Sequence, residues 1–306
     1  MSQELKCGVI GAGVFGGYHA NQYAKLPGAR LTAVLDMSLD RAAAVADPHG
    51  AKPFTELGAF LAAVDAVSIT SPALTHFDAA LAALKAGKAV YVEKPLAVTL
   101  DDAEALVAEA RRQKRVLAVG HQERMVFRAM GLFDLPEKPL RLEAIRRGTY
   151  SPRNRDVSCV LDLMIHDIDL ALDLSRSDVV NVEAKGRVEQ GPQLDEVSAE
   201  AIFDSGLIAF FDASRIAETR ERRMTLVYPS GQVEIDFLTR AFRNTTPFTL
   251  NADFAETPIG KDPLGAALGA FIAAARGEGD SLAAQAEEGA RALDLALAVE
   301  QAAEQG

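Results

Sequence analysis

Cysteine, tryptophan and positive charge are in short supply in this sequence. Its 306 residues include two cysteines, Cys7 and Cys159, and no tryptophan. Two cysteines are too few for a cysteine-rich zinc site or a disulfide framework, so we expect no metal centre and a reducing, cytoplasmic setting. Lysine and arginine total 32 against 43 aspartate and glutamate residues, a formal net charge of −11. A surface of that sign repels polyphosphate, which argues against a general nucleic-acid binder.

Long apolar runs are also missing. No stretch approaches the ~20 apolar residues that span a bilayer. The opening segment, MSQELKCGVIGAGVFGG, has no basic region and is interrupted by glycines, unlike a signal peptide. We therefore expect no membrane association. The sequence is 49% hydrophobic, enough for sizeable cores, and its length suits two domains.

The first 120 residues alternate short β-like runs with longer helical stretches, such as His76–Ala86 and Asp101–Lys114. The β-like runs are nearly continuous in apolar character, as strands buried on both faces should be. They read KCGVI, LTAVLD, DAVSIT, AVYVE and VLAVG. This alternation predicts a Rossmann domain with a parallel, doubly wound sheet over residues 1–120.

Residues 121–306 follow a different pattern. After a helix expected from about Cys159 to Asp173, strand-like segments succeed one another without long helices between them: VVNVEAKG, VSAEAIF, LIAFFDAS, RMTLVYP and QVEIDF. In QVEIDF, apolar and polar side chains alternate, as in a sheet with one covered face. Two alanine-rich helices are expected around Leu264–Arg276 and Ser281–Gln301. We predict an α+β domain with a mostly antiparallel sheet.

A glycine motif follows the first predicted strand and opens a predicted helix. It fits G-x-G-x-x-G over residues 11–16, and the cofactor-binding candidates in it are Gly11, Gly13, Val14, Phe15 and Gly16. Alone it is weak, because an ordinary glycine-rich turn also matches, but Asp36 ends the next strand 20 positions after Gly16. The glycines permit a tight turn, close approach of the backbone to a pyrophosphate and close helix–strand packing. The context predicts a dinucleotide with its phosphates at a helix N-terminus.

Asp36 also bears on which dinucleotide is bound. Its carboxylate can accept hydrogen bonds from the adenosine ribose hydroxyls and would repel a 2′-phosphate, so we expect NAD rather than NADP. Two alternatives stay open: Asp36 caps the next helix, or Arg41 receives a 2′-phosphate.

Further polar residues follow the third and fourth main strands of the predicted parallel sheet. Ser71, Pro72 and His76 follow the third, and the segment Glu93-Lys94-Pro95 follows the fourth. Open α/β sheets bind ligands at this carboxyl edge, so Lys94 is a candidate for chemistry. The ordinary alternative is a solvated lysine.

Asp162 and His166 are four residues apart on the helix expected in the second domain. At that spacing they share one helix face, where the carboxylate can orient or charge-stabilise the imidazole. The ordinary alternatives are a structural histidine and a solvated acidic face.

Together these segments resemble the Gfo/Idh/MocA family, named for glucose–fructose oxidoreductase and inositol dehydrogenase, over essentially the whole chain. The resemblance is carried by VIGAGVFG, ITSPALTH, ALKAGKAVYVEKPLAVT and LDLMIHDIDL. It implies a Rossmann domain followed by a domain with a large open sheet, often buried in a dimer or tetramer contact. It also implies that Lys94, Asp162 and His166 are the catalytic trio and that Glu93 and Lys94 lie beside the nicotinamide. We count Ser71, Pro72 and His76 among the cofactor-binding residues.

In such a site the residue chemistry predicts a dehydrogenase. His166 takes the proton from a substrate hydroxyl while hydride leaves the same carbon for the nicotinamide. Lys94 hydrogen-bonds that oxygen and stabilises developing alkoxide charge. Asp162 holds the tautomer and charge of the imidazole. The family often has a glycine-rich stretch before the aspartate, where this sequence has Val157-Ser158-Cys159, so we expect pocket walls unlike those of polyol-oxidising members.

The substrate is the least determined property. Arginines are frequent before the expected helix, and although salt bridges account for most, a few can converge on a phosphate. The segments Gly120–Arg124 and Val160–Asp169 resemble a UDP-sugar subgroup that includes UDP-N-acetylglucosamine 3-dehydrogenases. We predict a sugar or nucleotide-sugar substrate, UDP-N-acetylglucosamine first, contacted by His121, Arg124, Arg153 and Arg155. For His121 and Arg124 the alternative is a bridge between the two domains.

Three rival functions remain. One is a polyol or free-sugar dehydrogenase of the same family. A non-catalytic NAD-binding sensor is disfavoured by the intact trio, and an NADPH-dependent carbonyl or imine reductase is disfavoured by Asp36. The strand LIAFFDAS carries apolar residues on both faces, which together with the family pattern predicts a homodimer or homotetramer.

Overall fold

The computed structural model describes residues 4–151, 156–279 and 284–305, which form two compact units. The first unit contains Met1–Met125 and Asp262–Ala290, and the second contains Val126–Lys261 and Arg291–Gly306. A segment from late in the chain therefore belongs with the N-terminal sheet. The predicted domain boundary at residue 120 stays a prediction.

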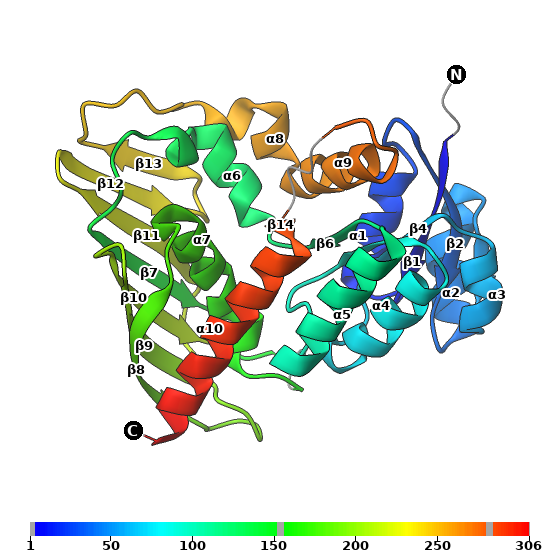
Figure 1. Cartoon of the computed structure of the whole chain (residues 1–306), viewed down its shortest axis with the longest axis horizontal. Coiled ribbons are helices and arrows are strands. Elements are labelled where there is room, and N and C mark those ends of the chain that lie inside the picture. Colours follow the sequence, from blue (N-terminus) through cyan, green and yellow to red (C-terminus); the bar gives the residue numbers. More distant parts are fainter. Residues whose placement is uncertain (1–3, 152–155, 280–283, 306) are drawn as a thin grey trace. The chain divides into compact units, whose positions relative to one another are not determined.

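The sheet of the first unit is parallel except at one edge (Figure 1). Its strands run in the order β14-β6-β5-β4-β1-β2-β3, and only β14 is antiparallel to its neighbour. The strands are β1 (Leu5–Ile10), β2 (Ala29–Leu35), β3 (Lys52–Phe54), β4 (Ala66–Ile69), β5 (Ala89–Val92), β6 (Leu117–Val119) and β14 (Ala284–Gln285). All residues of β4 and β5 are buried, as their continuous apolar character predicted.

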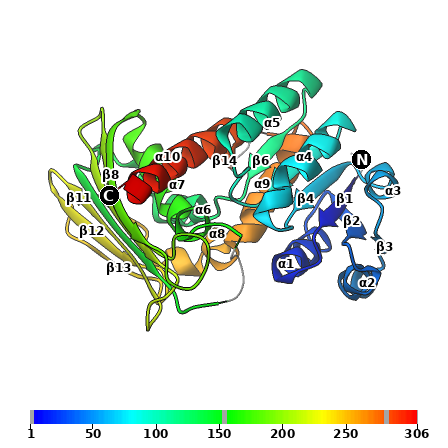
Figure 2. The same ribbon diagram turned by 90° about the horizontal axis from the view of Figure 1, so that it is seen from below.

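Helices cover both faces of this sheet, α1 and α2 one face and α4 and α5 the other (Figure 2). The helices are α1 (Val14–Tyr23), α2 (Leu39–Ala46), α3 (Leu57–Ala62), α4 (His76–Lys85), α5 (Leu100–Gln113) and α9 (Pro263–Ala275). Local sequence explains the start of α5: the Thr99 hydroxyl accepts a hydrogen bond from the Asp102 amide, and Asp101 and Asp102 lie in the first turn.

The second unit contains a mixed sheet in the order β13-β12-β11-β7-β10-β9-β8. Every neighbouring pair is antiparallel except β7 and β10, which are parallel. The strands are β7 (Arg141–Arg147), β8 (Val179–Arg187), β9 (Glu196–Phe203), β10 (Ile208–Ser214), β11 (Glu221–Tyr228), β12 (Gly231–Asp236) and β13 (Ala241–Asn244). The two sheets confirm the predicted fold class: a parallel Rossmann sheet and a mostly antiparallel second sheet.

Helices α7 and α10 lie on one face of the second sheet (Figure 2), and within the described residues no helix lies on the other face. The unit's helices are α7 (Ile165–Ser175), preceded by the π-helical turn Val160–Met164, and α8 (Pro258–Lys261). Two more, α6 (Glu123–Met130) and α10 (Ala286–Gln305), begin in the first unit. Short 3₁₀ turns occupy Asp47–His49, Ala73–Thr75, Leu132–Asp134 and Phe254–Glu256.

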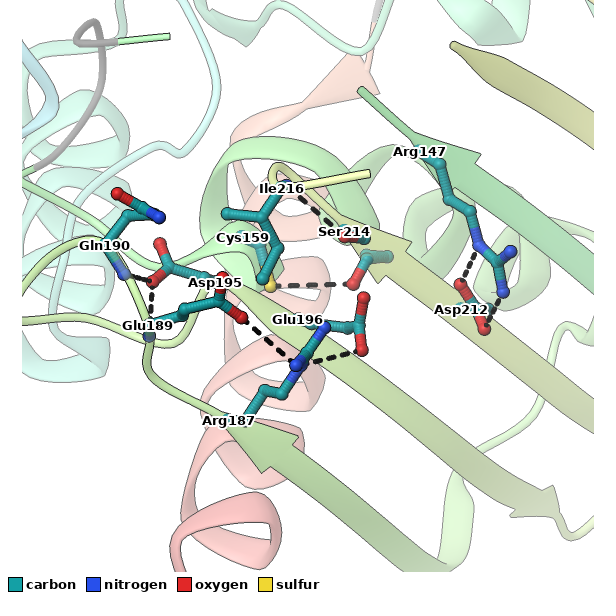
Figure 3. Close-up of polar contacts among 11 residues, drawn as sticks. Arg147, Cys159, Arg187, Glu189, Gln190, Asp195, Glu196, Asp212, Ser214 and Ile216 are labelled. Atoms are coloured by element: carbon teal, nitrogen blue, oxygen red, sulfur yellow. Dashed lines mark hydrogen bonds and ion pairs between the residues drawn. The ribbon is translucent and has the colours of Figure 1, made fainter. Parts of the chain in front are cut away.

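Two ion pairs of the second unit differ in burial. Figure 3 shows the Arg147–Asp212 pair and the contacts of Asp195 with Glu189 and Gln190. Asp195 has no exposed surface and accepts hydrogen bonds from the Glu189 and Gln190 amides at 2.8 and 2.6 Å and from Arg215 Nε at 2.6 Å. Burial alone would raise the pKa of Asp195, but these donors outweigh it and lower the pKa below its usual value. Arg147 and Asp212, on neighbouring strands, form a bidentate pair with 42% and 28% of their side chains exposed.

Replacing the buried carboxylate should cost far more stability than replacing the exposed one. We expect Asp195→Asn to lower the free energy of unfolding by about 3–5 kcal/mol, because it leaves the Arg215 guanidinium buried without its counter-charge. The matched control Asp212→Asn should cost at most about 1 kcal/mol, because water solvates Arg147. Urea denaturation followed by circular dichroism measures both, and equal losses would contradict the expectation.

Candidate active site

The glycine motif connects β1 to α1 and leaves space where a pyrophosphate would lie. A Cβ on Gly16 would overlap the carbonyl oxygen of Gly11, and one on Gly11 would lie 2.6 Å from the Ser71 nitrogen. A Cβ on Gly13 would meet nothing within 4 Å. Gly13 is the N-cap of α1 and has no side chain that could occupy the first amides of this helix. The loop fits a dinucleotide phosphate group, as the motif predicts.

Asp36 follows β2, and its carboxylate is fixed beside the glycine motif. Its Oδ2 accepts from the Ala12 amide at 2.9 Å, and its Oδ1 accepts from the Ser38 amide at 2.9 Å and from Arg41 at 2.6 and 3.0 Å. Burial would raise the pKa of Asp36, but the Arg41, Ser38 and Ala12 donors lower it, so the group stays ionised. Ser38, rather than Asp36, caps α2 through the Arg41 amide.

His76, on the helix that follows β4, contacts the segment that follows β5. His76 is 2% exposed, and its ring nitrogens lie 2.7 Å from the carbonyl oxygen of Pro95 and 2.9 Å from that of Ser71. Burial lowers the pKa of His76, although both carbonyl oxygens oppose that shift. His76 therefore links the Ser71 carbonyl to the carbonyl of Pro95, the residue that follows Lys94. Direct contacts of Ser71, Pro72 and His76 with the cofactor stay a prediction.

Lys94 is half-buried at the carboxyl edge of the sheet, and Glu93 beside it is 7% exposed. Glu93 accepts hydrogen bonds from His19 on α1 and from Gln122, which follows β6. Neither His19 nor Gln122 is among the site residues that the sequence predicts. The available signal was a histidine three residues after Gly16, on the face of α1 that packs inward.

Asp162 and His166 come from the π-helical turn and from the first turn of α7 in the second unit. The Ser158 hydroxyl accepts from the Val160 and Leu161 amides at 3.0 and 3.2 Å, which fixes the start of the turn. Asp162 and His166 are both half-exposed, whereas most of their neighbours in this segment are buried. That the two side chains share one accessible side, as the four-residue spacing predicts, stays a prediction. π-helical turns are frequent at functional sites.

A buried ion pair anchors this helix to the sheet. Arg146, 3% exposed on β7, donates to both carboxylate oxygens of Asp167 at 2.9 and 2.8 Å. Asp167 is the residue after His166. Val157, Ser158 and Cys159, just before the turn, are also buried, and Arg215 donates to the Val157 carbonyl oxygen. The start of this helix is therefore held by buried contacts as well.

The predicted substrate residues have varied surroundings. His121 and Arg124 are each 3% exposed, and Arg124 forms an ion pair of 2.9 Å with Glu288. Arg153 and Arg155 lie outside the described residues. Many other arginines are bound to carboxylates or carbonyl oxygens, as the salt-bridge interpretation predicts: Arg146, Arg147, Arg187, Arg215, Arg223 and Arg240.

Comparison with known proteins gives consistent matches. A model of an oxidoreductase family with an NAD-binding Rossmann fold, GFO_IDH_MocA, matches residues 5–121, and the GFO/IDH/MocA C-terminal domain matches residues 132–234. UDP-N-acetylglucosamine 3-dehydrogenase of Acidithiobacillus ferrooxidans is 36% identical over 77% of this chain and 75% of that protein. Its crystal structure superposes with a TM-score of 0.90 over 99% of both chains at 32% identity.

A second relative is an inositol enzyme. The scyllo-inositol 2-dehydrogenase (NAD⁺) of Bacillus subtilis is 30% identical over 70% of this chain and 68% of that protein. The family description confirms NAD as the predicted cofactor.

Asp36 should set the preference between the two nicotinamide dinucleotides. We expect the protein to bind NAD more tightly than NADP, and Asp36→Ala to weaken NAD binding more than NADP binding. Arg41→Ala is the matched control, because it removes the partner of Asp36 and leaves the carboxylate. Titration by calorimetry measures both affinities. Tighter binding of NADP by the unmodified protein would refute this role of Asp36.

Proposed function

Because the chain belongs to the Gfo/Idh/MocA oxidoreductase family, whose N-terminal domain is an NAD-binding Rossmann fold, we propose that it oxidises a secondary hydroxyl of a UDP-linked sugar. The 3-hydroxyl of UDP-N-acetylglucosamine is the first candidate. The observation that carries this choice is the 36% identity to a UDP-N-acetylglucosamine 3-dehydrogenase. The near-complete superposition with the crystal structure of that enzyme supports it.

Three side chains of this chain would perform the proton chemistry. When bound, NAD supplies the nicotinamide that accepts a hydride. His166 takes the proton from the substrate hydroxyl, and its half-exposed position on the accessible side of its helix suits contact with a substrate. Asp162, on the same side, orients the imidazole. Lys94 hydrogen-bonds the oxygen as negative charge develops there.

The cofactor would be held mainly by backbone. Gly11, Gly13, Val14, Phe15 and Gly16 provide the turn and the helix N-terminus for the pyrophosphate, and Asp36 accepts from the ribose. Ser71, Pro72, Glu93 and Lys94 lie at the ends of β4 and β5, the same carboxyl edge of the sheet.

A polyol dehydrogenase is the second candidate. The inositol relative supports it, because the same trio can oxidise any secondary hydroxyl that is presented to His166. The two functions differ in what they require beyond the reacting carbon. A UDP-sugar needs groups that hold a diphosphate, which inositol lacks, and we propose Arg153, Arg155, His121 and Arg124 for that role.

The setting and assembly are also proposals. No helix in the described ranges is long and apolar enough to cross a bilayer. We propose a cytoplasmic homodimer or homotetramer, formed through the face of the second sheet that no described helix covers. That face carries Phe210 beneath the Arg141 guanidinium, 4.5 Å from the ring centre. A monomer by light scattering at micromolar concentration would refute the assembly.

Removing the proposed reacting groups should abolish turnover and spare cofactor binding. We expect Lys94→Met and His166→Asn each to lower kcat by a factor of about 10² or more, the scale of lost acid–base or charge-stabilising groups. Asp162→Asn should cost less, since it only orients. The matched control is Asp178→Asn, whose side chain is 93% exposed. Stopped-flow measurement of NADH formation gives kcat, and wild-type turnover in either of the first two variants would exclude that residue from the mechanism.

UDP-N-acetylglucosamine should be a better substrate than N-acetylglucosamine or myo-inositol. Binding of the remote diphosphate can orient the reacting carbon, so the free sugar should lose kcat as well as affinity. NADH absorbance at 340 nm follows the reaction, with a trapping amine to draw the ketone product forward. If free sugar or inositol reacts as well as the nucleotide sugar, the UDP proposal fails and the polyol function replaces it.

A further inference from the structure

The proposed mechanism does not use a buried histidine on the helix that follows the glycine motif. His19 has no exposed surface, and neither have Ser68 and Tyr23 beside it. Its Nε2 lies 3.0 Å from Glu93 Oε1 and its Nδ1 lies 2.9 Å from Ser68 Oγ. The Tyr23 hydroxyl lies 2.6 Å from the same Ser68 oxygen. These residues form a buried chain from α1 through β4 to the end of β5.

When the His19 ring is neutral, the chemistry of the two ends assigns the direction of each hydrogen bond in this chain. The Glu93 carboxylate can only accept, so His19 Nε2–H is the donor. A neutral ring then accepts at Nδ1 from the Ser68 hydroxyl, and Ser68 accepts from Tyr23. Burial raises the pKa of Tyr23 well above its usual value, which keeps that hydroxyl protonated and able to donate. With all donors pointing toward Glu93, the bonds polarise one another in the same sense.

Glu93 is confined from the other side as well. Gln122 donates to Glu93 Oε1 at 3.0 Å. A Cβ added to Gly120 would lie 2.7 Å from Glu93 Oε2, so glycine is the residue that leaves room for this carboxylate. The Glu93 amide donates to the Ile69 carbonyl oxygen at 2.9 Å. The Glu93 carboxylate is thus held by His19 and Gln122, and its backbone amide is held by Ile69.

We propose that His19 is a positioning residue for the reaction: through Glu93 it fixes the orientation of Lys94. The inference rests on the proposed function of Lys94. A misplacement of a reacting group by about 1 Å can cost 10²-fold in rate, so loss of this support should be visible in kcat.

Two histidine variants separate positioning from packing. The amide of His19→Gln can replace Nε2–H and still donate to Glu93, whereas the shorter amide of His19→Asn occupies the place of Nδ1 and faces Ser68. Each variant loses one buried hydrogen bond, so both should be destabilised by similar amounts. We expect kcat with UDP-N-acetylglucosamine to stay near the wild-type value in His19→Gln and to fall by about 10-fold or more in His19→Asn. The Kd for NAD should be unchanged in both.

Gly120→Ala tests the same carboxylate without removing a hydrogen-bonding group. The backbone of Gly120 lies outside the left-handed region, and the three atoms nearest to an added Cβ all belong to the Glu93 carboxylate. We expect a loss of kcat comparable to that of His19→Asn. The matched control is Thr32→Val, which removes hydrogen bonds to the carbonyl oxygens of Cys7 and Ala63 in the same unit. It should lower Tm and leave kcat unchanged.

The outcomes separate this inference from the proposed function. If Lys94→Met abolishes turnover while His19→Asn has the same kcat as His19→Gln, positioning by His19 is refuted and the proposed role of Lys94 is kept. If the wild-type protein does not turn over UDP-N-acetylglucosamine, the proposed substrate is refuted, and hydrogen exchange in residues 93–97 decides the inference. Exchange there should accelerate in His19→Asn and Gly120→Ala but not in His19→Gln or Thr32→Val. Equal exchange in all four variants would overturn it.

Discussion

Charge buried next to the proposed reacting groups is the constraint that organises both units. An ionised group in an apolar interior costs several kcal/mol unless partners satisfy it, so few geometries are tolerated. Glu93 directly precedes Lys94 and is held by His19 and Gln122. Asp167 directly follows His166 and is held by the bidentate Arg146. In each unit a fixed charge thus sits one residue from a proposed reacting group, which takes its position from that neighbour.

Glycines are needed where another backbone group or a carboxylate lies too close for a Cβ atom. Gly16 lets α1 start against the Gly11 carbonyl, and Gly120 leaves room for the Glu93 carboxylate. The first permits a cofactor turn and the second a support for the lysine. Of these two glycines, only Gly16 belongs to a motif that sequence alone can identify, because its spacing to Gly11 and Gly13 is that of G-x-G-x-x-G. The need for glycine at 120 depends on a contact with a residue 27 positions earlier in the chain, which local pattern does not reveal.

The same distinction explains how much could be predicted from the sequence. Five strands of the first sheet, β1, β2, β4, β5 and β6, are largely apolar runs, so their positions and parallel arrangement followed from pattern. The edge strands β3 and β14 were not predicted, because they are only three and two residues long and mostly not apolar. Strand β7 was not predicted, because its third inward position is Arg146, whose charge hides the alternation of Leu142 and Ala144. The helix expected from Cys159 begins as a π-helical turn at Val160, where the Ser158 hydroxyl accepts from the first amides; apolar spacing does not reveal such a turn.

The arginines of the second unit show why substrate identity is harder to derive than fold. Their number in the sequence suggested an anion site, yet Arg146 and Arg215 form buried pairs with Asp167 and Asp195. A guanidinium whose fork is filled by a carboxylate cannot also bind a diphosphate without leaving that carboxylate buried and unpaired. Such arginines position the helix that carries His166, and this role is the same whether the substrate is a nucleotide sugar or a polyol. The UDP proposal therefore rests on the related enzyme, and the residues that decide between substrates must be ones that no buried carboxylate holds.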